Sequence, residues 1–107
     1  MKLFTVDQAN ATLPLVRKIV ADVVRQHSAW REKILELDLA SSNAQGEGEH
    51  GSAQRLEREV QALAREIAGF QRELDALGIE LKDPRLGLVD FPGETNGRRI
   101  LLCWRLG

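Results

Sequence analysis

The sequence predicts an α+β fold: a long antiparallel helical hairpin resembling a coiled coil, with a short N-terminal helix and a C-terminal antiparallel β-hairpin or three-stranded meander. Three observations predict it. Apolar residues recur at alternating spacings of four and three in two separate stretches. A polar, glycine-rich segment separates these stretches, and an Asn-Gly pair lies between two alternating stretches near the C-terminus. The length of 107 residues fits one domain spanning 1–107.

The chain is expected to open with a short helix. Thr5 and Gln8 have the spacing of a capping box, in which each side chain bonds the backbone amide of the other residue. Pro14 follows closely, and proline lacks the amide hydrogen that a helix interior uses. We therefore expect a short helix near 6–11, then a break or kink, and a second helix that Thr12 caps.

Two apolar runs form the predicted hairpin, because the alternating spacing puts the members of each run on one helix face. The runs are Val16, Val20, Val23, His27, Trp30, Ile34 and Leu37, and Leu56, Val60, Leu63, Ile67, Phe70, Leu74 and Leu77. Antiparallel pairing sets His27 against Ile67. It also brings Lys33 toward Glu59, an exposed charge pair of a few tenths of a kcal/mol.

The segment between the runs, residues 40–52, consists mainly of small, polar and glycine residues. Such a composition buries little apolar surface, so we expect a flexible loop that lets the second helix fold back. Gly78 is expected to end the second helix in the left-handed conformation, with Ile79 folding back onto Leu74.

The C-terminal hairpin is predicted by its turn. Asn96-Gly97 is the most favourable pair for a two-residue turn, because both residues tolerate a positive φ. This turn pairs Phe91 with Leu102. Pro92 has no amide hydrogen to donate to a ladder, so its strand is expected at an edge or with a bulge.

Composition excludes several functional classes. Fifteen basic and sixteen acidic residues give a net charge of -1 and are interleaved, so we expect no nucleic-acid partner. No apolar stretch has the length of a membrane span or a signal peptide. A single cysteine, Cys103, fits a reducing compartment. We expect a cytoplasmic protein without a cofactor or a metal.

The residues that could carry chemistry are few. Asp90 and Arg105 lie diagonally across the predicted hairpin, and Asp83 and Arg85 add charge nearby, so a cleft there is the candidate ligand site. The alternative is a structural ion pair. His27 is expected to be a polar residue of the helical seam and Cys103 a small packed residue, because neither has the neighbours that a metal site or a nucleophile needs.

A second group of residues suggests an interface between copies of the chain. The apolar stripe of the first helix is wider than a two-helix seam requires, since Ile19 and Val24 flank it on both sides. Ala62, Gly69 and Ala76 recur every seven residues on the second helix, where small side chains allow close approach of another element. We expect the sheet to cover one flank and a second copy to cover the other.

Four segments together resemble a known family. They are FTVDQANATLPL (4–15), LGIELKD (77–83), GLVDFP (87–92) and LLCWRLG (101–107). In this order they resemble an uncharacterised bacterial family, domain of unknown function 2203. The resemblance implies a small cytosolic prokaryotic protein without an assigned activity, and it supplies no catalytic residue. It also implies a further stretch with a Trp-His pair and a glycine-rich end after the Trp-Arg-Leu-Gly segment.

The leading functional hypothesis is a non-enzymatic interaction or scaffold domain that self-associates, forming a homodimer with four helices, with an unidentified protein as a further partner. The alternative is a small-molecule or metal-binding regulatory protein with its cleft near Asp90. Enzymatic activity ranks third, because no proton-transfer pair or nucleophile–base set is evident in the sequence.

Overall fold

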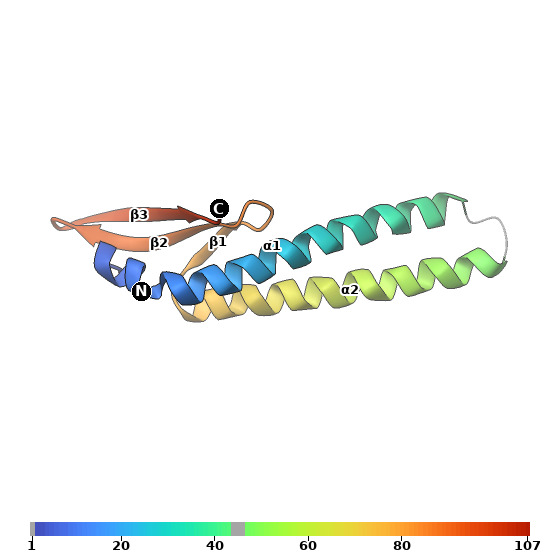
Figure 1. Ribbon diagram of the computed structural model, residues 1–107, viewed down its shortest axis with the longest axis horizontal. Helices are drawn as coiled ribbons and strands as arrows, with labels where there is room; N and C mark the ends of the chain where they lie inside the picture. The colour runs from blue at the N-terminus through green and yellow to red at the C-terminus, as the bar shows by residue number, and fades with distance from the viewer. Residues whose placement is uncertain (1, 44–46) are drawn as a thin grey trace.

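The computed structural model describes residues 2–43 and 47–107, and the side chains of residues 2–42 and 51–107. The molecule is elongated, 65 × 21 × 17 Å, with two antiparallel helices and a sheet at one end (Figure 1). Its elements are α1 (Val6–Asn43), α2 (Glu47–Ala76), β1 (Glu80–Asp83), β2 (Leu88–Thr95) and β3 (Arg98–Arg105). The predicted α+β class, helical hairpin and three-stranded meander are confirmed.

The start of α1 forms the predicted capping box. The Thr5 amide donates to Gln8 Oε1 at 3.0 Å, and the Gln8 amide donates to Thr5 Oγ1 at 3.1 Å. Two amide donors that the first turn leaves free are thereby satisfied.

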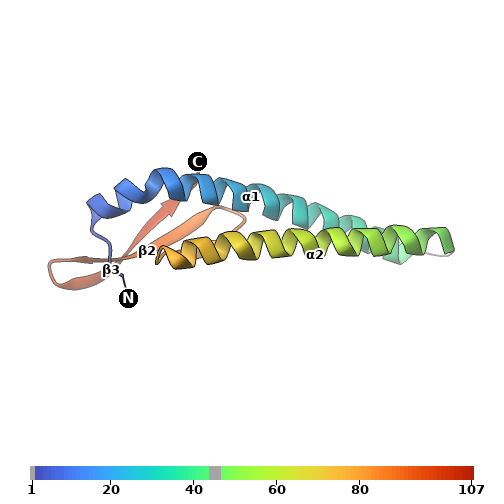
Figure 2. The ribbon, with the colours of Figure 1, turned by 90° about the horizontal axis from the view of Figure 1, so that it is seen from below.

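The predicted break near Pro14 is wrong, because α1 continues through it as one helix of 38 residues. Ala9 and Val16, on either side of the proline, are both buried in the core, and this packing holds the two parts in one helix. Thr12 caps nothing: its hydroxyl donates to the Gln8 carbonyl at 2.8 Å, an arrangement that tends to bend helices. Figure 2 shows that the axis of α1 changes direction in this N-terminal part.

The connection between the helices is shorter than predicted. Helical structure extends to Asn43 and resumes at Glu47, so most of the segment 40–52 expected as a loop is helical, while residues 44–46 lie outside the described residues. Adding a residue to an existing helix forms one more hydrogen bond, whereas only nucleation is strongly unfavourable. Extension of two long helices therefore overrides the weak propensity of this composition.

Polar contacts between the helices confirm the antiparallel pairing. Gln26 Nε2 donates to Glu66 Oε2 at 2.8 Å, and Lys33 Nζ lies 3.2 Å from Glu59 Oε2, as predicted. Hydrogen bonding to Glu59, and the nearby charge of Glu36, raise the pKa of Lys33.

The end of α2 follows the prediction for Gly78. Its φ is +80°, its amide donates to the Asp75 carbonyl at 2.9 Å, and the Ile79 amide donates to the Leu74 carbonyl at 3.0 Å. These are the two hydrogen bonds of a Schellman motif. Ile79 and Leu74 are both buried, so the chain is packed against the core at the point where it leaves α2.

The sheet has the order β1-β2-β3, and all pairs are antiparallel. Phe91 pairs with Leu102 as predicted, and the turn residues Asn96 and Gly97 have φ values of 52° and 77°. The register between β1 and β2 shifts between Leu81 and Asp83, which makes Lys82 the extra residue of a bulge.

The expectation that Pro92 marks an edge strand or a bulge in its own strand is wrong, because β2 is the central strand. Beyond the end of β1, the place beside β2 is taken by Phe4, which forms a parallel bridge to Gly93. The Phe4 amide donates to the Pro92 carbonyl at 2.7 Å. Pro92 takes part in this contact only as an acceptor, so its missing amide hydrogen is not required on this side of β2. A Cβ on Gly93 would lie 2.9 Å from the Phe4 carbonyl oxygen, so the close approach depends on this glycine.

The buried core lies at the sheet end of the molecule. Both ribbon views place the sheet beside the N-terminal half of α1 and the C-terminal end of α2 (Figures 1 and 2). The core cluster comprises Phe4, Ala9, Val16, Ile19, Val20, Leu74, Ile79, Val89 and Phe91. Phe4 and Phe91 meet edge to face, with ring centroids 5.3 Å apart.

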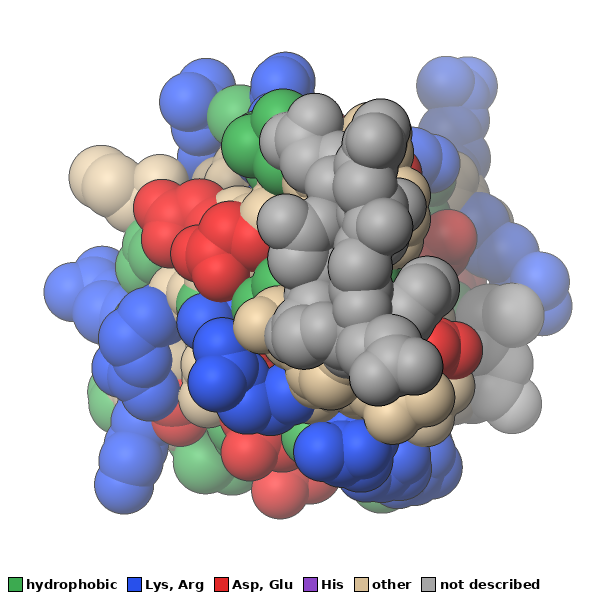
Figure 3. Space-filling view, turned by 90° about the vertical axis from the view of Figure 1, so that its right-hand side faces the viewer, with side chains coloured by type: hydrophobic (Ala, Val, Ile, Leu, Met, Phe, Trp, Pro, Cys, Tyr) green, Lys and Arg blue, Asp and Glu red, His purple; other side chains and the backbone are tan. Residues whose placement is uncertain are grey.

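The opposite end of the hairpin is less buried. Leu35 and Leu39 are each 64% exposed, and Trp30 and Ile34 are only half-buried. Figure 3, which looks at this end, shows basic and acidic side chains interspersed with small hydrophobic areas.

The connection from β1 to β2 lies directly on α1. Gly87 has a φ of +69°, and a Cβ there would lie 2.9 Å from Val20 Cγ1, 3.0 Å from Val24 Cγ2 and 2.8 Å from Leu106 Cβ. Gly87 is therefore required both by its backbone conformation and by the space it leaves to α1.

Replacing Gly87 with alanine should lower the free energy of unfolding by about 3 kcal/mol, because it adds overpacking to an unfavourable φ. Gly97→Ala is the matched control: Gly97 also has a positive φ, but a Cβ there meets nothing within 4 Å. It should lose only about 1 kcal/mol. Urea unfolding of both variants measures the difference, and equal losses would contradict the close packing at Gly87.

Candidate functional site

The four residues predicted to line a polar cleft, Asp83, Arg85, Asp90 and Arg105, lie in different local surroundings. Asp83 Oδ1 accepts the backbone amides of Arg85 at 2.9 Å and Leu86 at 3.3 Å. Its carboxylate thus stabilises the turn after β1. The Arg85 and Arg105 side chains belong to exposed residues.

Asp90 is buried at 2% exposure, and it is the one charged residue buried to this degree among the described side chains. Its Oδ1 accepts a hydrogen bond from Cys103 Sγ at 2.9 Å, and its Oδ2 lies 3.6 Å from Lys82 Nζ. Arg105 lies diagonally opposite in the sheet, as expected, but the ion pair of Asp90 is formed with Lys82. Glu80 lies directly opposite Asp90 in the sheet, so alternation along β1 places Lys82, two residues further on, on the same face as Asp90.

Cys103 is exposed, so the expectation that it is a small packed residue is wrong: its side chain lies on the outer face of β3. Hydrogen bonding to the Asp90 carboxylate raises the pKa of the Cys103 thiol. The thiolate is the nucleophilic form of cysteine, so the neighbouring carboxylate makes Cys103 a poorer nucleophile. Among the side chains of residues 2–42 and 51–107, no group of three or more His, Cys, Asp or Glu could hold a metal ion.

His27 lies in the helical seam, as predicted. Its ring is 5.4 Å from that of Trp30, and both residues line a cavity of about 160 Å³ together with Ala64 and Ile67. His27 Nδ1 is buried and has no hydrogen-bond partner among the described atoms. Residues of both α1 and α2 line this cavity, and those other than His27 are apolar.

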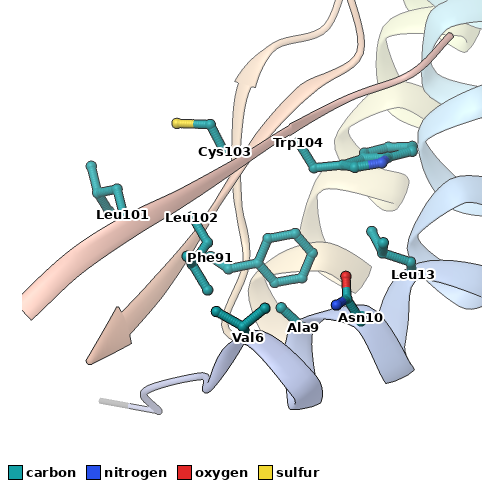
Figure 4. Close-up of a pocket in the computed structure, with 9 residues that line it drawn as sticks. All are labelled: Val6, Ala9, Asn10, Leu13, Phe91, Leu101, Leu102, Cys103 and Trp104. Carbon is teal, nitrogen blue, oxygen red and sulfur yellow. The ribbon is translucent and has the colours of Figure 1, made fainter. Parts of the chain in front are cut away.

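An apolar pocket of about 290 Å³ lies between the first turns of α1 and β3, and we call it the strand pocket (Figure 4). Phe91, Leu102 and Trp104 point toward α1, whereas Cys103 points away on the other face of β3. Asn10 lies on the α1 side. The sequence had indicated this apolar face of the hairpin, but not the opening beside it.

A second apolar depression, about 530 Å³, lies between α1 and α2, and we call it the helix groove. It is lined by Leu15, Lys18, Ile19, Asp22, Phe70, Glu73, Ala76 and Leu77, so none of its walls comes from the sheet. Leu15 is 50% exposed, although Ile19 is buried at 7%.

The five predicted interface residues are distributed as follows. Ile19 and Ala76 line the helix groove. Val24 instead packs close to Gly87 of the same chain. Ala62 is exposed and Gly69 half-buried on α2. Sequence reasoning missed Leu15, whose only available signal was an apolar side chain one residue outside the heptad run.

No helix in the described part of the chain combines the length and the apolar character required to cross a bilayer.

Removing the Asp90 charge should make Cys103 more reactive. In Asp90→Asn, the pKa of the thiol should fall because no carboxylate opposes ionisation, and the rise in alkylation rate should move to lower pH. Lys82→Gln is the matched control of opposite sign, since the Lys82 charge lowers the pKa of Cys103. Iodoacetamide labelling against pH measures both shifts, and the single cysteine makes the readout unambiguous. An unshifted profile in Asp90→Asn would contradict the assigned cause.

Comparison with known proteins gives one match. The model of the family described as "Uncharacterized conserved protein (DUF2203)" matches residues 2–107. Neither the curated proteins nor the solved structures contain a match to this chain. The chain belongs to the DUF2203 family.

Proposed function

We propose that this protein is an interaction domain that self-associates through the helix groove, so that two hairpins pack into a four-helix arrangement. The observation that carries the proposal is an apolar depression between two long helices, with the half-exposed Leu15 at its rim. Single exposed apolar residues are ordinary on a surface, but an apolar groove shared by two helices is typical of a helix-packing surface.

The narrow cross-section of the molecule supports the packing of a second copy against its helices. The sheet covers one flank of α1, where Val24 packs near Gly87. On the other flank Ile19 is buried but Leu15 is half-exposed, and the described residues that line the groove there come from α1 and from the end of α2 up to Leu77. A helix with apolar residues on both sides of its seam is stabilised when both sides are covered.

The charges around the groove are compatible with two-fold pairing. Lys18 and Glu73 lie on its two sides, from α1 and α2 respectively. In a two-fold interface the same surface meets itself, so Lys18 of one copy can approach Glu73 of the other at two equivalent places. A purely acidic or basic rim would repel its own copy.

The face is also large enough. A stable interface buries about 800 Å² on each partner. The molecule is 65 Å long and its two smaller dimensions are 21 and 17 Å, so part of one long side supplies this area.

Sedimentation equilibrium of the double variant Leu15→Glu/Ala76→Glu tests the proposal. Both residues are exposed in the single chain, so the fold should persist, as circular dichroism would verify. The parent protein should be a dimer at tens of micromolar, and the variant should dissociate at least about 100-fold more readily, because carboxylates would be buried in the contact.

The matched control is Leu101→Glu, which changes a leucine of 58% exposure on the sheet. It should leave the dimer intact. A monomeric parent protein, or a dimer unaffected by the groove variant, would rule out self-association through this surface.

A further inference from the structure

The outer edge of β3 is a second surface of the molecule, available for pairing with a strand of another chain. β3 is an outer strand of the sheet, and its register with β2 is continuous over all eight residues (Figure 1). The five residues 100–104 in its centre are all apolar, and Leu101 is 58% exposed. Natural edge strands usually carry a bulge, a proline or a central charge that prevents pairing. The centre of β3 has none of these.

The strand pocket lies beside this edge. Leu102 and Trp104 form its β3 side, and Val6, Ala9 and Leu13 contribute from α1 (Figure 4). No charged residue lines it, and Val6 is 56% exposed at its mouth. An extended segment added next to β3 would direct every second side chain toward α1, and therefore into this pocket.

The ends of β3 are positively charged. Arg98 and Arg99 lie at its start and Arg105 at its end, all three are exposed, and the strand contains no acidic residue. Among the residues that the structure describes, none of these three arginines forms an ion pair. The edge thus has an apolar centre between two basic ends, and the complementary strand has acidic ends.

The same charges disfavour a second copy as the occupant. Two β3 strands that pair antiparallel about a two-fold axis bring Arg98 and Arg99 of one copy toward Arg105 of the other. Like charges facing one another across strands are destabilising. A partner with carboxylates at both ends has no such conflict.

We propose that the β3 edge binds an extended segment of a partner protein by strand addition, and that this segment has alternating apolar residues at its centre and acidic residues at its ends. The proposal goes beyond self-association, because the strand pocket and the helix groove share no residue. Backbone hydrogen bonds to β3 would supply the register, the pocket would select the apolar side chains, and the arginines would select the charge.

The probe is a synthetic octapeptide, added to the full chain. Its four central residues alternate between valine and threonine, and its two residues at each end are glutamates. Two control peptides carry lysine in place of glutamate, or N-methylated valines that cannot donate backbone hydrogen bonds. Trp30→Phe leaves Trp104 as the sole tryptophan, so emission reports on the strand pocket. The acidic peptide should shift this emission and slow hydrogen exchange at the β3 amides that point away from β2. Both control peptides should do neither.

Charge reversal supplies the decisive comparison. Arg98→Glu/Arg105→Glu should weaken the acidic peptide about tenfold and strengthen binding of the lysine peptide, since the end of β3 then carries the opposite sign and its start, where Arg99 remains, is neutral. The matched control, Arg58→Glu/Arg72→Glu on the exposed side of α2, should change either affinity by less than about twofold.

Three results would overturn the proposal: no binding of the acidic peptide, equal binding after charge reversal at β3, or protection that maps to the helices. Protection of β3 amides that rises with protein concentration in the absence of peptide would also overturn it, because the occupant would then be a second copy.

Discussion

The structure depends on one packing contact, the burial of the inner face of β2 against the start of α1 and the end of α2. Val89 and Phe91 of β2 are almost fully buried in the same cluster as Val20 and Leu74. A β-hairpin is marginal in water by itself, and so is a two-helix hairpin. Each here supplies the apolar surface that the other lacks. Phe4 completes the contact, because it packs edge to face on Phe91 while its backbone bonds to β2.

This arrangement has a consequence for where recognition can occur. The shared core satisfies the sheet-facing flank of α1 and the inner face of the sheet. In the described part of the chain, no element covers the side chain of Leu15 on α1 or pairs with the outer edge of β3. The two surfaces differ in physical character: the helix groove is apolar with charges of both signs at its rim, whereas β3 is apolar between basic ends. For these reasons we propose a second copy as the occupant of the first surface and an acidic strand as the occupant of the second.

Periodicity and turn chemistry predicted the parts of the fold that repeat. The two heptad runs identified the helical seam, and Asn96-Gly97 fixed the pairing of Phe91 with Leu102. Both signals are local. In the heptad runs many residues indicate the same helix face, and in the hairpin a strongly restricted turn indicates the same register as the alternation of the strands. The Gly78 cap is an equally local signal, because a single glycine is enough to predict the left-handed conformation at the helix end.

The features that were missed depend on tertiary contacts. Pro14 reads as a helix break, but packing of Ala9 and Val16 on either side outweighs it. The Phe4 bridge leaves no periodicity in the sequence, because it involves a single residue beside β2.

The candidate site was predictable only in part. Asp90 was identified, and the register placed it diagonal to Arg105. Its partners are Lys82 and Cys103. The predicted register sets Cys103 directly opposite Asp90, but the turn after β1 fixed no register between β1 and β2, so Lys82 was not identified as the partner. Of the residues predicted for an interface between copies, Ile19 and Ala76 line one groove, but Val24 does not, since Gly87 approaches α1 at that point.

Native-state hydrogen exchange tests the central claim most directly, namely that one core at the sheet end stabilises the whole chain. We expect the amides of residues 16–23, 70–76 and 89–91 to exchange only by global unfolding, and those of residues 30–42 and 51–60 to exchange through openings of lower free energy. Equal protection along the full length of both helices would contradict it, because the distal hairpin would then be as stable as the core.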